Sequence, residues 1–235
     1  MNSDQYNSTQ YNLTKKIKMV MALRQAGIND TNVLNAMEAV PREHFIPDAM
    51  ADQAHEDIAV PIGQGQTISQ PSVVAKMIEA LELTDRHKVL EVGTGTGYQA
   101  CVLSKVCRRV YTIERHKPLY DLAEENFSSL HVRNVTALYG DGMRGWPMIN
   151  GIDQAPFDRI IVAAAARKDP PPALIDQLTV GGILLIPVGE AGEQKVMRYK
   201  KEADDMTSIQ ELMPVRFVPL LPDIAKEGEE ERVMA

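Results

Sequence analysis

The chain has 235 residues, of which 44% are hydrophobic and 24% are charged, and its formal net charge is −7 at pH 7. This length and balance are typical of one large globular domain with enough apolar residues for a sizeable core. The negative charge disfavours a nucleic-acid backbone as the main partner, because such binding requires a basic surface.

Hydropathy and cysteine content indicate in which cellular compartment the protein is expected. No apolar run approaches the ~20 residues that a transmembrane helix needs. The N-terminal stretch is polar, so we expect neither a membrane partner nor a signal peptide. Cys101 and Cys107 match no zinc or redox motif, and we expect buried free thiols in a reducing compartment. These features predict a cytoplasmic protein, for which a monomer is the working assumption.

The first 85 residues read as helices and loops. Residues 1–10 are rich in Asn, Ser and Gln and predict a disordered tail. Helical patterns cover residues 11–25, 31–39 and 71–83, and Asp30 or Thr31 can cap the second of them. Residues 41–70 contain several prolines and glycines, which predict loops with short strands. We therefore assign residues 11–85 to an N-terminal elaboration.

From residue 86 onward, short apolar strands alternate with helical segments. The predicted strands cover residues 88–92, 109–114, 134–139, 157–163 and 182–188. The predicted helices cover residues 98–107, 119–130 and 171–178. This alternation is typical of a parallel sheet with right-handed crossovers. Two further strands, 195–200 and 207–218, follow without helices and predict an antiparallel edge.

The predicted fold class is therefore α/β, with a doubly wound, mostly parallel sheet of seven strands and an antiparallel C-terminal edge. The N-terminal helical elaboration precedes this core, which we place at residues 86–225. Residues 226–235 read KEGEEERVMA and predict a charged, mobile tail.

A glycine-rich loop follows the first strand of this core, with the sequence GTGTG at residues 93–97. Alternate glycines let a ligand lie against bare backbone, and the next helix presents free N–H groups to an anion. The sixth position, where dinucleotide-binding proteins need glycine, is Tyr98. Together with Glu91, the loop instead resembles the first motif of methyltransferases that use S-adenosylmethionine (AdoMet). That resemblance implies that the loop binds the methionine end of AdoMet, with Glu91 near its ammonium group.

Two more acidic residues end successive strands of the predicted sheet. Glu114 ends the second strand, where a carboxylate can accept hydrogen bonds from both ribose hydroxyls. Asp141 and Gly142 follow the third strand, where they can contact adenine. The alternatives are a solvated strand-end glutamate and an Asx turn. The predicted donor-binding residues are Glu91, Gly93, Thr94, Gly95, Gly97, Glu114, Asp141 and Gly142.

Five segments carry a more specific pattern. They are VPREHF at residues 40–45, GQGQTISQP at 63–71, LEVGTGTGYQA at 90–100, GDG at 140–142 and RFVPL at 216–220. In this order they resemble the protein-L-isoaspartate (D-aspartate) O-methyltransferases over residues 35–221. The resemblance implies transfer of a methyl group from AdoMet to the α-carboxylate of isoaspartyl residues in damaged proteins, with D-aspartyl residues as a further acceptor. The methyl ester then collapses to a succinimide, which starts repair.

The resemblance also implies an acceptor side around Ser69, which we predict to be the active-site residue. Gln66, Thr67 and Ile68 are weaker predictions for substrate binding, and the loop at 63–66 is expected to cover the donor. A carboxylate acceptor is already nucleophilic, so the chemistry needs no metal, and the sequence has no metal-ligand cluster. Ser69 also precedes Pro71 and an apolar helical run, so it equally fits a helix N-cap.

Three other functions stay open at this point. They are an O-methyltransferase for a small-molecule carboxylate, a nicotinamide-dependent oxidoreductase, and a non-catalytic adaptor that binds AdoMet and damaged proteins. The segments at 63–71 and 216–220 disfavour the first, Tyr98 disfavours the second, and Ser69 disfavours the third.

Overall fold

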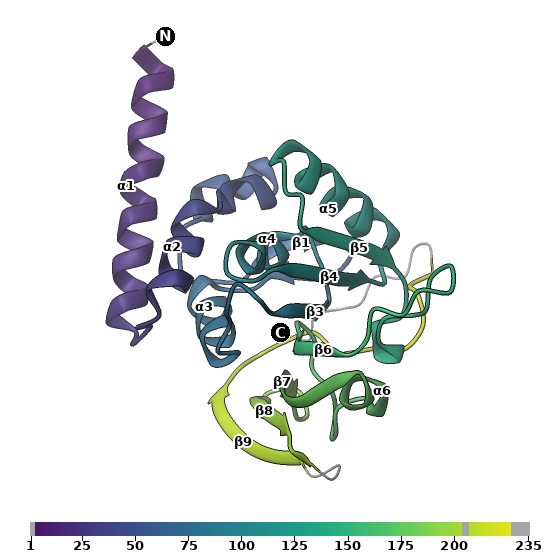
Figure 1. The fold of residues 1–235 in the computed structure, drawn as a ribbon. Coiled ribbons are helices and arrows are strands. Elements are labelled where there is room, and N and C mark those ends of the chain that lie inside the picture. The colour runs from purple at the N-terminus through teal and green to yellow at the C-terminus, as the bar shows by residue number, and fades with distance from the viewer. Residues whose placement is uncertain (1–2, 204–206, 227–235) are drawn as a thin grey trace.

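The computed structural model describes residues 3–203 and 207–226 of the chain, and its centre is a seven-stranded sheet (Figure 1). The strands are β3 Lys88–Val92, β4 Arg109–Glu114, β5 Val135–Tyr139, β6 Phe157–Val162, β7 Leu178–Val188, β8 Lys195–Lys201 and β9 Thr207–Pro214. Their order is β5-β4-β3-β6-β7-β8-β9, with parallel pairing up to β7 and antiparallel pairing of β8 and β9. The predicted fold class is confirmed, and the last strands follow chain order.

Helices cover both faces of the sheet, because side chains alternate between the faces along each strand. The helices are α1 Ser3–Gln25, α2 Thr31–Ala39, α3 Pro71–Ala80, α4 Tyr98–Ser104, α5 Lys117–Ser129 and α6 Pro172–Asp176. Val89 of β3 belongs to one hydrophobic cluster, together with residues of α1 to α5. Its neighbour Leu90 belongs to the other, together with Leu174 of α6 and Trp146.

The N-terminal segment contains the predicted helices with shifted ends. Helix α1 begins at Ser3 rather than at residue 11, and it projects beyond the rest of the molecule in Figure 1. Asp30 caps α2 as predicted, since its carboxylate accepts hydrogen bonds from the Asn32 and Val33 amides. The mobility of residues 1–10 and the domain boundaries stay predictions. Apart from its first residue, the charged tail at 226–235 lies outside the described residues.

A short hairpin precedes α3 and confirms the expectation of loops with short strands. It consists of β1 Val60–Gly63 and β2 Gln66–Ile68, paired antiparallel. Gln64 and Gly65 form its turn with φ of 55° and 67°, the left-handed values that tight hairpin turns require. The hairpin carries the chain directly into Ser69 and the start of α3.

The remaining expectations about the cysteines and about membranes can be checked against the described residues. Cys101 and Cys107 are buried and form no disulfide. None of the helices in residues 3–203 or 207–226 is long and apolar enough to span a bilayer.

Candidate active site

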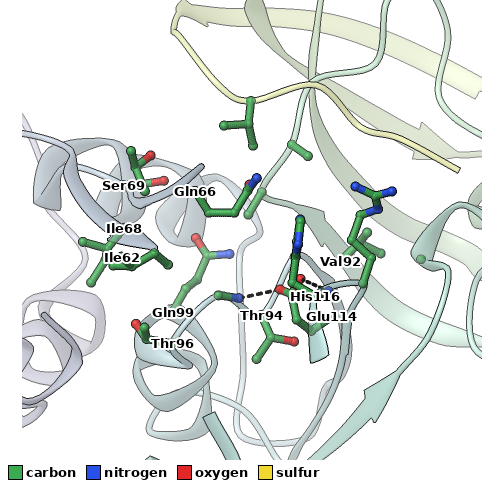
Figure 2. A pocket seen from close by; sticks show the side chains of 18 of the residues that line it. Ile62, Gln66, Ile68, Ser69, Val92, Thr94, Thr96, Gln99, Glu114 and His116 are labelled. Atoms are coloured by element: carbon green, nitrogen blue, oxygen red, sulfur yellow. Dashed lines mark hydrogen bonds between the residues drawn. The ribbon is translucent and has the colours of Figure 1, made fainter. Parts of the chain in front are cut away.

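A cavity that is partly open to solvent lies at the carboxyl ends of β3, β4 and β6. Open α/β sheets bind their ligands at this edge. Three segments far apart in the sequence form its walls, namely the glycine loop, the end of the hairpin and the C-terminal segment. Figure 2 shows Ser69, Gln66 and Glu114 around this one cavity.

The glycine loop has little room for side chains. Gly93, Gly95 and Gly97 have φ of 93°, 55° and 93°, which disfavour any residue with a Cβ. A Cβ on Gly97 would lie 2.6 Å from the Phe127 ring, and one on Gly93 would lie 3.3 Å from the Ala163 Cβ. Gly93, Thr94 and Gly95 line the cavity, whereas Gly97 packs behind it, and donor binding by the loop stays a prediction.

Most amides of this loop already donate hydrogen bonds within the protein. The amides of Gly93 and Thr94 donate to the Ile113 carbonyl, and the Gly97 amide donates to the Thr94 carbonyl. The Gly95 amide donates to the Glu114 carboxylate. The first N–H groups of a helix have no acceptor within it, so the start of α4 is where a ligand carboxylate would find donors.

The segment at 40–45 fixes the far side of the loop. The Thr96 hydroxyl donates to the Phe45 carbonyl at 2.9 Å. The Phe45 ring meets Tyr98 edge to face at 5.5 Å, and the Arg42 guanidinium lies 4.8 Å from the centre of the Tyr98 ring. Tyr98 is therefore a buried packing residue, and this explains why the sixth position of the motif is not glycine.

Glu114 lines the cavity where the sequence predicts it. Its two oxygens accept hydrogen bonds from the Gly95 amide at 2.8 Å and the His116 amide at 2.9 Å. Burial raises the pKa of Glu114, and these amides oppose that shift. A carboxylate has about four lone-pair positions, so it retains acceptors for a pair of ribose hydroxyls. That contact stays a prediction.

Glu91 lies behind the cavity wall rather than on it. It is fully buried and is not among the residues that line the cavity. Its carboxylate accepts hydrogen bonds from the Thr112 hydroxyl at 2.5 Å and from the Gln99 amide at 3.0 Å. Burial raises its pKa to about 8. Gln99 and Thr94 stand at the cavity wall beside it, and a contact of Glu91 with a ligand ammonium stays a prediction.

Asp141 is not among the residues that line the cavity, whereas Gly142 lines it. The Asp141 carboxylate accepts the Met143 amide at 2.9 Å and pairs with Arg144 at 3.1 Å. This is the Asx turn given above as the alternative. A Cβ on Gly142 would lie 2.4 Å from a methyl group of Val92, so the strand end and the turn are in close contact.

The acceptor-side residues all face the cavity. Gln66, Thr67, Ile68 and Ser69 line it. The alternative function of Ser69 as a helix cap is wrong, because Gln70 is the N-cap of α3 and makes no side-chain cap bond. Instead the Asp57 carboxylate accepts the Ser72 amide of the first turn at 2.8 Å.

The C-terminal segment supplies a wall that the sequence analysis left without a role. Residues 218–221, which overlap the segment at 216–220, line the cavity. This stretch pairs with Ala165, whose amide donates to the Val218 carbonyl and whose carbonyl accepts the Leu220 amide, both at 2.8 Å. The buried Gln194 holds it through both backbone groups of Phe217.

Four further residues at the cavity or directly behind it were not predicted from the sequence. His116, Gln99 and Arg115 line the cavity, and Thr112 lies behind it. Within residues 3–203 and 207–226, no cluster of three His, Cys, Asp or Glu side chains could hold a metal ion. Trp146 packs edge to face on Tyr111 in the core below the sheet rather than at the cavity.

Comparison with known proteins places the chain among relatives of one kind. Residues 14–224 match the family described as Protein-L-isoaspartate(D-aspartate) O-methyltransferase (PCMT). The chain is similar to the protein-L-isoaspartate O-methyltransferase of Rhodospirillum centenum, with 53% identity over 91% of this chain and 95% of the relative. It is also similar to the protein-L-isoaspartate O-methyltransferase of Parvibaculum lavamentivorans, with 54% identity over 91% of this chain and 95% of that relative.

Solved structures give the same result. A protein-L-isoaspartate O-methyltransferase aligns with a TM-score of 0.76 and 28% identity, over 87% of this chain. The chain spans 65% of that longer protein. A Plasmodium falciparum chain, described as a protein-L-isoaspartate O-methyltransferase in complex with S-adenosyl-L-homocysteine, aligns with a TM-score of 0.71 and 26% identity. The alignment covers 87% of this chain and 97% of that one.

Proposed function

The chain belongs to the protein-L-isoaspartate(D-aspartate) O-methyltransferase family, and we propose that it binds donor and acceptor in the single cavity between the glycine loop and Ser69. It is an AdoMet-dependent O-methyltransferase that methylates the free α-carboxylate of L-isoaspartyl residues. The methyl ester then closes to a succinimide, and this starts repair of the damaged protein.

One observation carries the assignment of sites. Ser69 and Thr67 line the same cavity as Gly93, Gly95 and Glu114, although some 25 to 45 residues separate them in the chain. A reaction between two bound molecules needs both in one enclosure, with the reacting atoms held in line. The cavity therefore has a donor end at β3 and β4 and an acceptor end at the hairpin.

The acceptor end fits a carboxylate. AdoMet supplies a methyl group on a positively charged sulfur, and the isoaspartyl carboxylate attacks it directly, so no general base is required. We propose that the Ser69 hydroxyl, which lines the cavity, donates a hydrogen bond to the acceptor carboxylate. Gln66 and Thr67 add polar groups beside it, and Ile68 and Ile62 supply an apolar floor.

The donor end fits the adenosine and methionine parts of AdoMet. Glu114 offers carboxylate lone pairs for the ribose hydroxyls. Gly142 and Val92 pack closely together at the cavity wall, where they can contact the adenine ring. The turn at 63–66 precedes the acceptor residues directly, and we propose that it closes over the bound donor. D-aspartyl residues are the second proposed acceptor, and the cytoplasm is the proposed location.

The function is tested by incubating the protein with methyl-labelled AdoMet and an isoaspartyl peptide beside its normal aspartyl twin. Base-labile label on the isoaspartyl peptide alone is expected. A D-aspartyl peptide in the same assay tests the second acceptor. Label on neither peptide, with AdoMet bound, would favour methylation of a small-molecule carboxylate or an adaptor function.

A further inference from the structure

The C-terminal segment crosses the donor end of the cavity as a strap, which we define as residues 218–225. In the sheet, β3 lies between β4 and β6, so the glycine loop after β3 lies between the ends of the other two strands. The strap is bonded to Ala165, which follows β6, and to Arg115, which follows β4. Figure 2 shows Glu114 and His116, the chain neighbours of Arg115, at this end of the cavity. The strap therefore spans the glycine loop from one side to the other.

The start of the strap is held by backbone pairing. Pro219 forms a parallel bridge with Ala165, whose amide and carbonyl bond Val218 and Leu220, both at 2.8 Å. The buried Gln194 side chain holds the residue just before the strap through both of its backbone groups. This end is thus part of the sheet edge.

The far end of the strap is held by Arg115. The guanidinium Nε donates to the Asp223 carbonyl at 3.1 Å, and Nη2 donates to the Pro222 carbonyl at 3.5 Å. The Arg115 carbonyl accepts the Ala225 amide at 2.9 Å. A planar guanidinium is suited to hold two successive carbonyls in this way. Pro222, Asp223 and Ile224 are exposed, so this end can move without disturbing the core.

The backbone of the far end also favours a separate, bent segment. Pro222 has no N–H group, so it cannot extend the pairing with the sheet. Asp223 has φ of 60°, a left-handed value that is uncommon for a residue with a Cβ. The chain bends at this residue and returns to Arg115, and the position of the bend depends on the arginine.

We infer that the strap is a gate over the donor end and that Arg115 is the positioning residue that latches it. The inference rests on the proposed function, because it takes AdoMet and its product as the ligands that pass the gate. Opening at residues 222–225 would leave the pairing with Ala165 in place. Donor and product could then exchange while the acceptor end around Ser69 stays assembled.

A latch and a ligand contact differ in their effect on binding rates. The bonds from Arg115 to the strap join the chain to itself, so they oppose opening both for a ligand that enters and for one that leaves. Loss of the latch therefore raises the association and dissociation rate constants together and leaves Kd nearly unchanged. Loss of a direct contact would raise the dissociation rate constant alone, and Kd would rise by the same factor.

Both rate constants can be measured with labelled S-adenosylhomocysteine and rapid filtration. We expect Arg115→Ala to raise each of them about fivefold, which corresponds to about 1 kcal/mol of lost hydrogen bonding, with Kd within about twofold of the wild type. Arg115→Lys can reach one carbonyl and should give a smaller increase. Release of 5′-methylthioadenosine, which has the same adenosine and sulfur without the amino-acid end, should accelerate equally, because the gate covers the nucleoside.

Arg144→Ala is the matched control. Arg144 pairs with the Asp223 carboxylate at 3.4 Å, but the two side chains are 77% and 73% exposed, and such pairs contribute little. Its rate constants should stay within about twofold of the wild type. Hydrogen exchange adds a measurement without ligand: Arg115→Ala should expose the Ala225 amide to exchange, while the Leu220 amide stays protected.

Two results would overturn the inference. Faster release with an unchanged association rate constant would make Arg115 a ligand contact, and unchanged rate constants in Arg115→Ala would show that it latches nothing. If the wild type itself binds neither thioether, the proposed function fails, and hydrogen exchange at Ala225 still decides whether Arg115 holds the strap.

Discussion

Glu91 and Glu114 are buried carboxylates on adjacent parallel strands, and the register between the strands decides what each can reach. Glu91 lies level with Thr112, and Val92 lies level with Ile113. Glu114 is therefore one step beyond the last residue of β3 and emerges at the sheet edge, whereas Glu91 stays within the sheet. This difference explains why Glu114 lines the cavity and Glu91 does not.

The affinity for S-adenosylhomocysteine should depend on pH through Glu91. The pKa of Glu91 is about 8 in the free protein, so the residue is mostly protonated at pH 6. Binding of an ammonium favours the ionised form, so it releases a proton and the affinity rises with pH toward about 8. Above that, Glu91 is already ionised in the free protein and the rise stops.

Titration calorimetry from pH 6 to 8.5 measures this profile. Glu91→Gln should lose the rising part, and 5′-methylthioadenosine should show none in either protein. A wild-type profile that stays flat across this range would rule out coupling between Glu91 and the ligand.

The sequence predicts residues at strand ends well, because a short apolar run followed by glycine or an acid marks the end of a parallel strand. Glu114 and the loop glycines could be placed on this basis. The orientation of Glu91 and Asp141 could not, since it depends on strand register and on local turn bonds such as that from Met143.

At the scale of elements, the hairpin and α3 hold Ser69 from both sides. The N-terminus of α3 is held by Asp57, whose carboxylate accepts a hydrogen bond from the Ser72 amide, 15 residues further along the chain. Asp57→Ala should lower the free energy of unfolding by about 1 kcal/mol, as loss of a helix cap does. Urea unfolding measures this, with Asp57→Asn as the control that keeps an acceptor.

The same experiment separates the two interpretations of Ser69. Because Ser69 caps nothing, Ser69→Ala should leave the unfolding free energy close to that of the wild type. A loss comparable with that of Asp57→Ala would restore the capping role.

Element positions could be predicted from the sequence, but several element ends could not. Helix α3 stops at Ala80 because the chain turns at Glu82, which has φ of 53° although it is not glycine. Strand β7 begins at Leu178 rather than at residue 182, so residues 178–181 also belong to it. Each of these ends depends on tertiary contacts that local propensity does not contain.

At the scale of the whole molecule, two glutamine side chains each hydrogen-bond both backbone groups of one distant residue, and they do so at different places. Gln194 binds both backbone groups of Phe217, next to the cavity wall at 218–221. Gln177 binds both backbone groups of Trp146, which lies away from the cavity. This pair allows the contribution of the C-terminal wall to be measured against a matched control.

Gln194→Ala should release the C-terminal wall and weaken S-adenosylhomocysteine several-fold, since about 1 kcal/mol of hydrogen bonding corresponds to roughly a fivefold change. Gln177→Ala should lower thermal stability while leaving that affinity unchanged. Equal affinities in the two variants would show that the wall at 218–221 does not contribute to ligand binding.

The overall sheet could be predicted from the alternation of strands and helices, but the return of the C-terminal segment to the cavity could not. That return depends on the pairing of Ala165 with Val218 and Leu220, more than fifty residues apart. Periodicity reports local structure only, so contacts of this range are invisible to it. The order of β8 and β9 in the sheet could not be predicted for the same reason.

The central claim is that Ser69 and the glycine loop serve one reaction in one cavity. It is tested most directly by the rate of methyl transfer to an isoaspartyl peptide at saturating AdoMet, measured for the wild type and Ser69→Ala with the aspartyl twin as blank. We predict a turnover at least about tenfold lower in Ser69→Ala, which a lost hydrogen bond to a charged group supports, with unchanged affinity for S-adenosylhomocysteine. Equal turnover in the two proteins would contradict the account.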